Sequence, residues 1–490
     1  MLLNKKIDNK NIFFGIILIY YFFYILSVII VDGYPQTNDI LHIFKIAPLD
    51  GNLKFLIGIY GPGYTYYSLI FSNSLNVLSF FIVSLNLLSC VLIFVLVKEF
   101  YKINSVKEGN LYFLTLLFHL IILTTIGFNH SDSIFILLFY NGLLIFVYGH
   151  YLRKKNYFIV FGLLLIGIAA IFRHQGPFAI LLLFINFLLI EHLVNKKFIL
   201  FSKKYFLYGI ILSLPTILAH IHLYTVDAIV NWQTSFKLHY FFHGETWGDW
   251  RDLKYVLVSE DVKNFSITQV DINHAIKIIY NHLHGILRIV YPFIFCFLIA
   301  FYLSKKKVII YSLILFLIYI LITLAGYHRG YYPSIFFCFI SVILCFKEIY
   351  KNKIFSTLIF IFLFGHFIYV SDNYVRDVIE RYKINQDIKK NVVPILNKEK
   401  ISYKNIFSDD YNFYTTRLNG KMHNMCNWGG WLLNHPYLYD YYPREVVLKK
   451  DNKYCDVKVL ITRDKKLVQE YENKEQYKTI YKTDFYYLLM

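Results

Sequence analysis

The residues best suited to chemistry in this sequence are acids in a long polar segment near the N-terminus. Residues 31–67 read VDGYPQTNDILHIFKIAPLDGNLKFLIGIYGPGYTYY and lie between the first two apolar runs of the chain. They include Asp32 and Asp39. A carboxylate held at a membrane surface can act as a general base that takes a proton from a hydroxyl group. We therefore expect Asp39 to be catalytic, with Asp32 as the second choice.

Each of these acids also has a simpler explanation. Asp39 precedes an apolar run, and an aspartate in that position is a common N-cap of a helix. The two roles are compatible, because a carboxylate at the start of a helix is held rigidly. Asp32 lies at the boundary of the first apolar run, where topology alone explains an acid.

Two pairs of basic residues adjoin apolar runs later in the chain. Arg173 and His174 occur in IFRHQGP, and His328 and Arg329 occur in GYHRGYYP. A guanidinium group binds phosphate through two parallel hydrogen bonds, so we expect these residues to hold a lipid phosphate. The alternative for each arginine is a side chain that extends from a span to the membrane surface.

A third polar group lies in the short segment GFNHSDS, which contains His130 and Asp132. Ionisable residues in a tight turn at membrane depth are unfavourable unless they have partners. One explanation is a turn in which Asp132 or Ser131 caps the next helix. The other is that His130 and Asp132 bind a divalent metal ion or a substrate. The sequence leaves both explanations open.

The composition indicates which elements position these residues. The chain has 490 residues, of which 57% are hydrophobic, and its mean hydropathy is +0.47. Soluble domains are about 45–50% apolar. The excess here occurs in runs of about 18–22 residues, which is long enough to cross the hydrocarbon core of a bilayer. We therefore predict an α-helical polytopic membrane protein with about 11 transmembrane helices. The predicted spans are residues 11–31, 76–97, 110–128, 132–150, 157–172, 175–192, 205–223, 286–304, 308–325, 333–346 and 354–370.

The distribution of charge predicts the orientation of these spans. The net charge is +18, and Lys and Arg are concentrated in the loops on the N-terminal side. This pattern places the N-terminus in the cytoplasm and explains the charge without a nucleic-acid partner. An odd number of spans then places residues 371–490 outside, together with the loops 32–75 and 224–285. The expected location is the cell membrane, plasma or inner.

We expect two domains. Residues 1–370 form the transmembrane domain, and residues 371–490 form a small extracytoplasmic α/β domain. Charged residues and Asn become more frequent in the second domain, and short β-like runs occur at 445–448 and 457–462. The sequence contains no CxxC motif that would indicate a zinc or redox site. It leaves open whether Cys426 and Cys455 form a disulfide.

The order of these features resembles the C superfamily of membrane glycosyltransferases, especially the protein-O-mannosyltransferase and aminoarabinose-transferase type. The first outer loop contains an acid, and Tyr60-Gly61-Pro62-Gly63-Tyr64 precedes the second span. A polar turn opens the fourth span, and a Gly- and Ala-rich span ends in Arg173. Later in the chain, YHRGYYPSIFF precedes a span, and a soluble outer domain follows at the end. The matching motifs are short, but they are distributed over the whole chain.

The chain departs from this family pattern in two places. Asn38-Asp39-Ile40 stands where many relatives have an Asp-Glu pair, and Gly-Pro-Gly stands where Pro-Pro-Leu is usual. The departures leave open which acid is the base and whether a metal ion is bound.

The resemblance implies a polyprenyl-phosphate sugar donor and an acceptor hydroxyl on a glycan, lipid or protein outside the cell. In such an enzyme Asp39 would take the proton of the hydroxyl. Arg173 and Arg329 would hold the phosphate, and Tyr60 and Tyr64 would contribute to substrate binding. The sugar would be transferred with inversion.

Three other classes of membrane protein fit parts of the sequence. An O-antigen-type polymerase also has many spans and long outer loops, but a folded outer C-terminal domain is less expected there. A transporter or flippase for lipid-linked saccharides would place ionisable residues near the membrane midplane and show internal repeats. We find no repeat in the sequence. A structural or regulatory membrane protein would not need the long acidic first loop.

Overall fold

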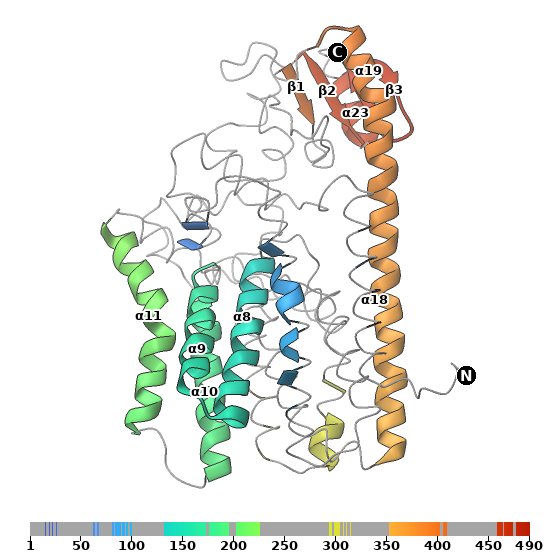
Figure 1. Cartoon of the computed structure of the whole chain (residues 1–490). Helices are drawn as coiled ribbons and strands as arrows, with labels where there is room; N and C mark the ends of the chain where they lie inside the picture. Colours follow the sequence, from blue (N-terminus) through green and yellow to red (C-terminus); the bar gives the residue numbers. More distant parts are fainter. Residues whose placement is uncertain are drawn as a thin grey trace, which may run out of the picture. The chain divides into compact units, whose positions relative to one another are not determined.

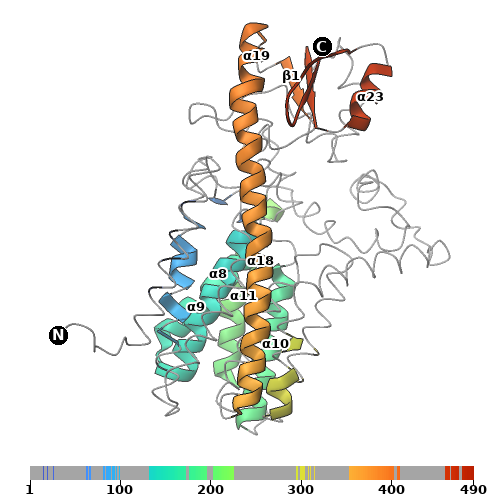
Figure 2. The same cartoon turned by 90° about the vertical axis from the view of Figure 1, so that its right-hand side faces the viewer.

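We describe the fold from a computed structural model of the whole chain (Figures 1 and 2). The chain divides into two compact units, which we describe separately. The first unit comprises Met1–Phe22, His42–Phe242 and Asp271–Asp372, and the second comprises Phe23–Leu41, His243–Val270 and Asn373–Met490. The residues that the structure describes are 15, 19, 22, 26, 62–63, 66–67, 81–82, 84–89, 91–93, 95–96, 99, 132–172, 176–195, 202–225, 294–295, 298–303, 307, 310, 314, 352–401, 405–408, 458–463, 465–473 and 477–490.

The described part of the first unit is built on consecutive apolar helices that lie side by side (Figures 1 and 2). Their sequences are mostly apolar, so each helix buries side chains against its neighbours. They are α8 (Asp132–Val147), the π-helical turn η2 (Tyr148–Arg153), α9 (Asn156–Ala170), α10 (Gly176–Asn195) and α11 (Lys203–Thr225).

A two-residue turn joins η2 to α9. Lys154 adopts the left-handed conformation, with a φ of 51°, and ends η2. The next residue, Lys155, donates its backbone N–H to the carbonyl oxygen of Gly149 at 3.1 Å. Such a left-handed residue is a common helix stop, because it lets the chain satisfy carbonyls of the last turn. The turn makes α8 and α9 an antiparallel hairpin.

Glycines allow α8 and α9 to pack closely. A Cβ atom added to Gly162 would lie 2.6 Å from the backbone nitrogen of Phe146 and 2.8 Å from the carbonyl oxygen of Gly142. Small residues at helix crossings let backbones approach and are typical of helix packing in membranes. Gly162 of α9 therefore serves contact with α8, whereas a Cβ atom on Gly167 would meet the carbonyl oxygen of Leu212 in α11.

We expect Gly162→Ala to destabilise the first unit. Alanine is favoured over glycine in a helix by about 1 kcal/mol, but here its methyl group would push two backbones apart, and overpacking costs about 1–3 kcal/mol. Thermal unfolding of the purified protein would measure the change. Gly365→Ala is the control, because a Cβ atom at Gly365 has nothing within 4 Å. The interpretation fails if both substitutions shift the unfolding temperature in the same direction by the same amount.

Buried polar side chains also connect the helices of this unit. The Ser89 hydroxyl donates to Asn141 Oδ1 at 2.8 Å, and Asn141 Nδ2 donates to the carbonyl oxygen of Leu85 at 2.9 Å. All three residues are buried. Asn141 thus ties the middle of α8 to the helical segment around Ser89, and the hydrogen bonds satisfy its amide in an apolar interior.

Helices lie over several of the predicted spans. α8 with η2, α9, α10 and α11 correspond to the predicted spans 132–150, 157–172, 175–192 and 205–223. Among the described residues, Ser133–Arg153 and Lys203–His222 are long and apolar enough to cross a membrane by length and composition. The number of spans and their sidedness stay predictions.

The helix α18 (Lys353–Asp387) contributes residues to both units. It covers the predicted span 354–370 and continues past it. In the second unit it is followed by η5 (Ile388–Val392) and α19 (Val393–Lys398). Pro394 lies in the first turn of α19, directly after the π-helical turn η5.

A four-stranded sheet completes the described part of the second unit. Its strand order is β1-β2-β4-β3, with β1 parallel to β2 and the other pairs antiparallel. Ile384, Ile388 and Leu396 pack with residues of the sheet in one hydrophobic core. The elements are β1 (Ile406–Ser408), β2 (Val459–Thr462), α23 (Lys465–Asn473), β3 (Thr479–Lys482) and β4 (Tyr487–Leu489).

The second unit thus combines helices and a sheet in the region where the sequence predicts an α/β domain. The strand β2 lies within the predicted run 457–462. The predicted run 445–448, Cys426 and Cys455 lie outside the described residues.

Candidate functional site

The candidate site begins where Gly63 meets the end of α9. Gly63 donates its backbone N–H to the carbonyl oxygen of Ile171 at 2.9 Å. A Cβ atom on Gly63 would lie 2.7 and 2.8 Å from two ring carbons of Phe172 and 3.0 Å from its Cα. Only glycine fits this contact without movement of Phe172. Two segments more than a hundred positions apart in the sequence are therefore in direct contact.

Tyr66, three residues after Gly63, contacts the end of α11. The hydroxyl of Tyr66 lies 2.6 Å from Nδ1 of His222, which is in the last turn of α11. Burial raises the pKa of Tyr66, so the phenol is protonated at neutral pH and donates to Nδ1 when that nitrogen carries no proton. Burial also raises the pKa of Tyr67 to about 12. The ends of α9 and α11 and the residues Gly63 and Tyr66 thus form one cluster.

The predicted site residues adjoin this cluster in the sequence. Tyr64 follows Gly63, and Arg173 follows Phe172. Asp132 is the first residue of α8, whose start lies at the end of α9 because the two helices form an antiparallel hairpin. The predicted residues outside the described residues are Asp32, Asp39, Tyr60, Tyr64, His130, Arg173, His174, His328 and Arg329.

We expect Gly63→Ala and Phe172→Ala to be strongly coupled. The new methyl group at position 63 meets the Phe172 ring, so removing the ring should relieve most of its cost. Contacting residues typically show coupling free energies of about 0.5–3 kcal/mol. A double-mutant cycle of unfolding temperatures would measure the coupling. Equal effects of Gly63→Ala with and without Phe172 would mean that the two residues do not touch.

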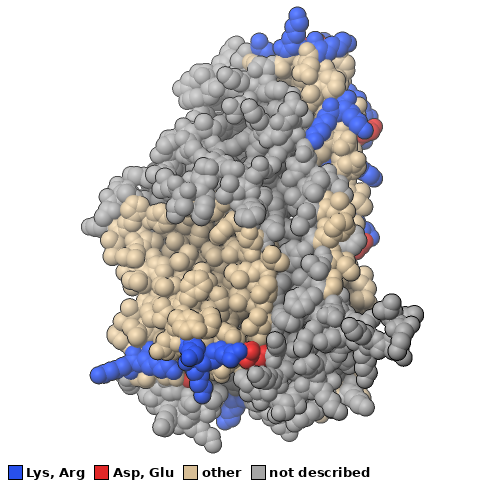
Figure 3. Space-filling model, in the orientation of Figure 1, with Lys and Arg blue, Asp and Glu red and all other residues tan. Residues whose placement is uncertain are grey.

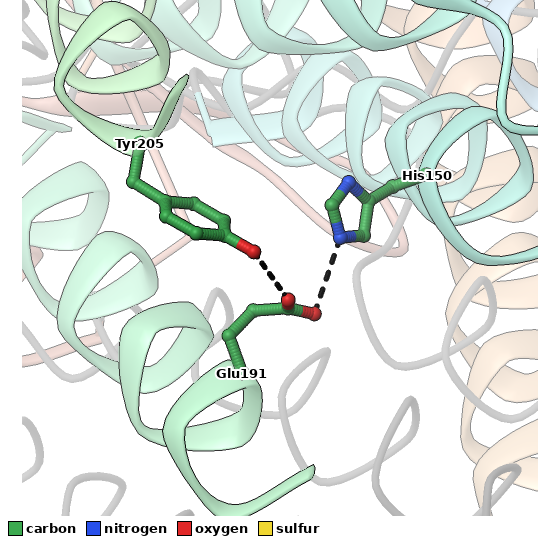
Figure 4. A network of polar contacts seen from close by, with 3 residues as sticks. All are labelled: His150, Glu191 and Tyr205. Atoms are coloured by element: carbon green, nitrogen blue, oxygen red, sulfur yellow. Dashed lines mark hydrogen bonds and ion pairs between the residues drawn. The ribbon is translucent and has the colours of Figure 1, made fainter. Parts of the chain in front are cut away.

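A second polar cluster lies where η2, the end of α10 and the start of α11 meet (Figure 4). His150 of η2 lies with Nε2 at 3.1 Å from Glu191 Oε1, and the Tyr205 hydroxyl donates to Glu191 Oε2 at 2.6 Å. The side chains of His150 and Glu191 are only 6% and 5% exposed. One residue each from η2, α10 and α11 thus meets at a buried carboxylate.

Rings enclose this cluster and hold His150 in place. Phe146 stacks on the imidazole at a centroid distance of 5.5 Å, and Phe187 lies edge-on to it at 5.2 Å. His150 Nδ1 is buried without a hydrogen-bond partner. A neutral imidazole that donates from Nε2 avoids burying a second N–H group, so this tautomer fits best. Glu191 therefore receives a donor at each oxygen, which is typical of a structural tie between helices.

Sequence reasoning missed this cluster. Its signal was a single acid in an apolar run, Glu191 in FLLIEHLVN, with histidine and tyrosine near the ends of neighbouring runs. An ionisable residue in such a run needs a partner, so the position of Glu191 in the sequence predicts a buried polar contact. No fixed spacing connects it to His150 and Tyr205, because the contacts are tertiary.

The described residues contain no group of three His, Cys, Asp or Glu side chains that could bind a metal ion. The predicted metal ligand His130 is outside this set, and of Asp132 only the backbone is described. A divalent metal ion at His130 and Asp132 therefore stays a prediction.

Comparison with known proteins adds no family assignment. No protein-family model, curated protein or solved structure matches this chain.

Proposed function

We propose that the chain is an inverting glycosyltransferase that moves a sugar from a polyprenyl-phosphate donor to an acceptor hydroxyl on the outer face of the membrane. The observation that carries the proposal is the contact of Gly63 with Ile171 and Phe172. It joins two of the segments on which the resemblance rests, and the residues that follow them are Tyr64 and Arg173. An aromatic residue and a guanidinium group are chemically suited to a phosphate-bearing lipid.

The proposed reaction needs one base and groups that hold phosphate. The carboxylate of Asp39 takes the proton from the acceptor hydroxyl as the acceptor oxygen attacks the anomeric carbon. The bond from this carbon to the phosphate oxygen breaks, and polyprenyl phosphate leaves with both electrons of that bond. Arg173 and Arg329 hold the negative charge that develops on the leaving phosphate. Attack opposite to the leaving group inverts the anomeric carbon.

The positions of the described polar clusters favour a glycosyltransferase over a transporter. Glu191, His150 and Tyr205 meet at the ends of their helices, beside the basic turn Lys154–Lys155. A transporter of charged substrates would be expected to place such groups near the midplane. The polar residue in the middle of α8, Asn141, is neutral and hydrogen-bonded to Ser89 and Leu85, so it is not such a charged group.

The stereochemistry of the product tests the proposed reaction. Purified full-length protein would be incubated with a panel of polyprenyl-phosphate sugars and a mixture of glycan, lipid and peptide acceptors. NMR of the product should show an anomeric configuration opposite to that of the donor. Retention of configuration would rule out the single displacement with Asp39 as base.

A further inference from the structure

The ends of the helices opposite to the candidate site carry a group of exposed cations. We call this group the basic rim, and it consists of Arg153, Lys154, Lys155, Lys203 and Lys204. The contacts between His150, Glu191 and Tyr205 bring the ends of η2, α10 and α11 together, so the cations on these ends are neighbours. Figure 3 shows Lys and Arg in a row along the lower edge of the surface over α8 to α11.

Carboxylates neutralise little of this charge. Arg153 pairs with Glu99 at 2.7 Å, and among the described residues this is the single ion pair of the rim. Glu191 lies beneath the rim, but His150 and Tyr205 occupy its oxygens. The four lysines have no described carboxylate partner, so they present a cluster of positive charge that suits an anionic ligand.

Aromatic side chains lie next to the cations of the basic rim. The ammonium group of Lys204 lies 5.5 Å from the ring centre of Tyr205 and 5.6 Å from that of Tyr208. Tyr157 is 64% exposed and Phe206 is 70% exposed. Exposed aromatic rings next to lysines are typical of the boundary between lipid headgroups and acyl chains.

Beyond the rim, the surface of these helices becomes apolar. Exposed residues of α9 include Phe161 and Ile168, and those of α11 include Leu214, Ile217, Leu218 and Ile221. The change from cations through aromatic rings to aliphatic side chains follows the order of layers in one leaflet of a bilayer. A soluble anionic partner would explain the cations but not this apolar surface.

We propose that the basic rim binds the headgroups of anionic phospholipids, with the apolar faces of α9 and α11 against their acyl chains. The inference rests on the expected membrane insertion and not on the glycosyltransferase activity. Clustered lysines at a membrane surface attract anionic lipids by about fivefold in affinity for each lysine, and salt weakens the attraction.

A lipid titration of the purified full-length protein in neutral detergent tests the proposal. Phosphatidylglycerol and phosphatidylcholine with the same acyl chains would be added, and the unfolding temperature would report binding. We expect phosphatidylglycerol to stabilise the wild type at a concentration at least about tenfold lower than phosphatidylcholine. The difference should shrink when NaCl is raised to about 0.5 M.

Neutralising the rim should remove the preference for the anionic lipid. The variant is Lys154→Asn with Lys155→Gln, Lys203→Gln and Lys204→Gln; asparagine tolerates the left-handed backbone of residue 154. The control neutralises four exposed lysines of the second unit, Lys383, Lys390, Lys398 and Lys465, and should keep the preference. If the fourfold variant does not fold, each pair (154 with 155, or 203 with 204) should lose part of the preference.

Three results would overturn the proposal. The first is equal stabilisation of the wild type by the two lipids. The second is a rim variant that folds and keeps the full preference. The third is stabilisation by heparin as large as that by phosphatidylglycerol, which would indicate a soluble polyanion as the partner.

Discussion

Asp39→Asn is expected to reduce sugar transfer by about a thousandfold, because a general base contributes about 10²- to 10⁴-fold to such reactions. The amide that replaces the carboxylate cannot accept the proton of the acceptor hydroxyl, while its size and polarity are nearly the same. Donor binding should change little, since the base touches the acceptor. Single-turnover transfer with wild type and variant at matched, folded concentrations would measure the effect.

Asp32→Asn is the matched control for this experiment, because it makes the same chemical change at the other acid of the loop. We expect this variant to keep most of the activity. If Asp32→Asn is inactive and Asp39→Asn is active, the base is Asp32 and the glycosyltransferase proposal stands. If both variants keep full activity, neither acid is the base, and the proposed mechanism is wrong.

Glu191→Leu is expected to have the largest effect on stability. It removes the acceptor for His150 and Tyr205 and leaves two donors buried in an apolar surrounding. Each unsatisfied buried donor costs about 1–3 kcal/mol, so we expect a loss of about 3 kcal/mol or more. Thermal unfolding of the purified protein in detergent should show a drop of several degrees.

The matched control is Glu380→Leu in α18. Glu380 also pairs with a basic residue, Arg463, at 3.0 Å, but its side chain is 57% exposed. Exposed ion pairs contribute about 0–1 kcal/mol, so this variant should unfold close to the wild-type temperature. Replacing the three residues together by His150→Phe, Glu191→Leu and Tyr205→Phe should recover much of the stability, because the two donors that bond to Glu191 are then removed with it. If Glu191→Leu unfolds at the wild-type temperature, the buried cluster does not hold the helices together.

The helices over the predicted spans were predictable because their apolar runs are long and end in charged residues. α9 (Asn156–Ala170) and α10 (Gly176–Asn195) begin and end within a few residues of the predicted positions. α18 was harder, since hydropathy falls after residue 370 while the helix continues to Asp387. That last part is amphipathic and buries Val378 and Ile384. A search for apolar runs does not detect such a segment, whereas helical periodicity does.

The strands and the polar clusters depended on contacts that sequence patterns do not contain. The strand β4 has three residues and pairs with β2 and β3, and such short runs are ambiguous alone. Glu191 was visible as an acid in an apolar run, but its partners come from η2 and α11. For Gly63 the sequence indicated a loop motif, and the structure adds its contact with Phe172.

The most direct test of the proposed function is to follow donor and products in liposomes that contain the purified protein. Polyprenyl-phosphate sugars would be supplied on the side of the bilayer where residues 371–490 are expected, together with acceptors. We predict that one donor of the panel is consumed and that free polyprenyl phosphate and glycosylated acceptor appear in equal molar amounts. Movement of an intact lipid-linked sugar across the bilayer, with no free polyprenyl phosphate from any donor, would contradict it and favour a flippase.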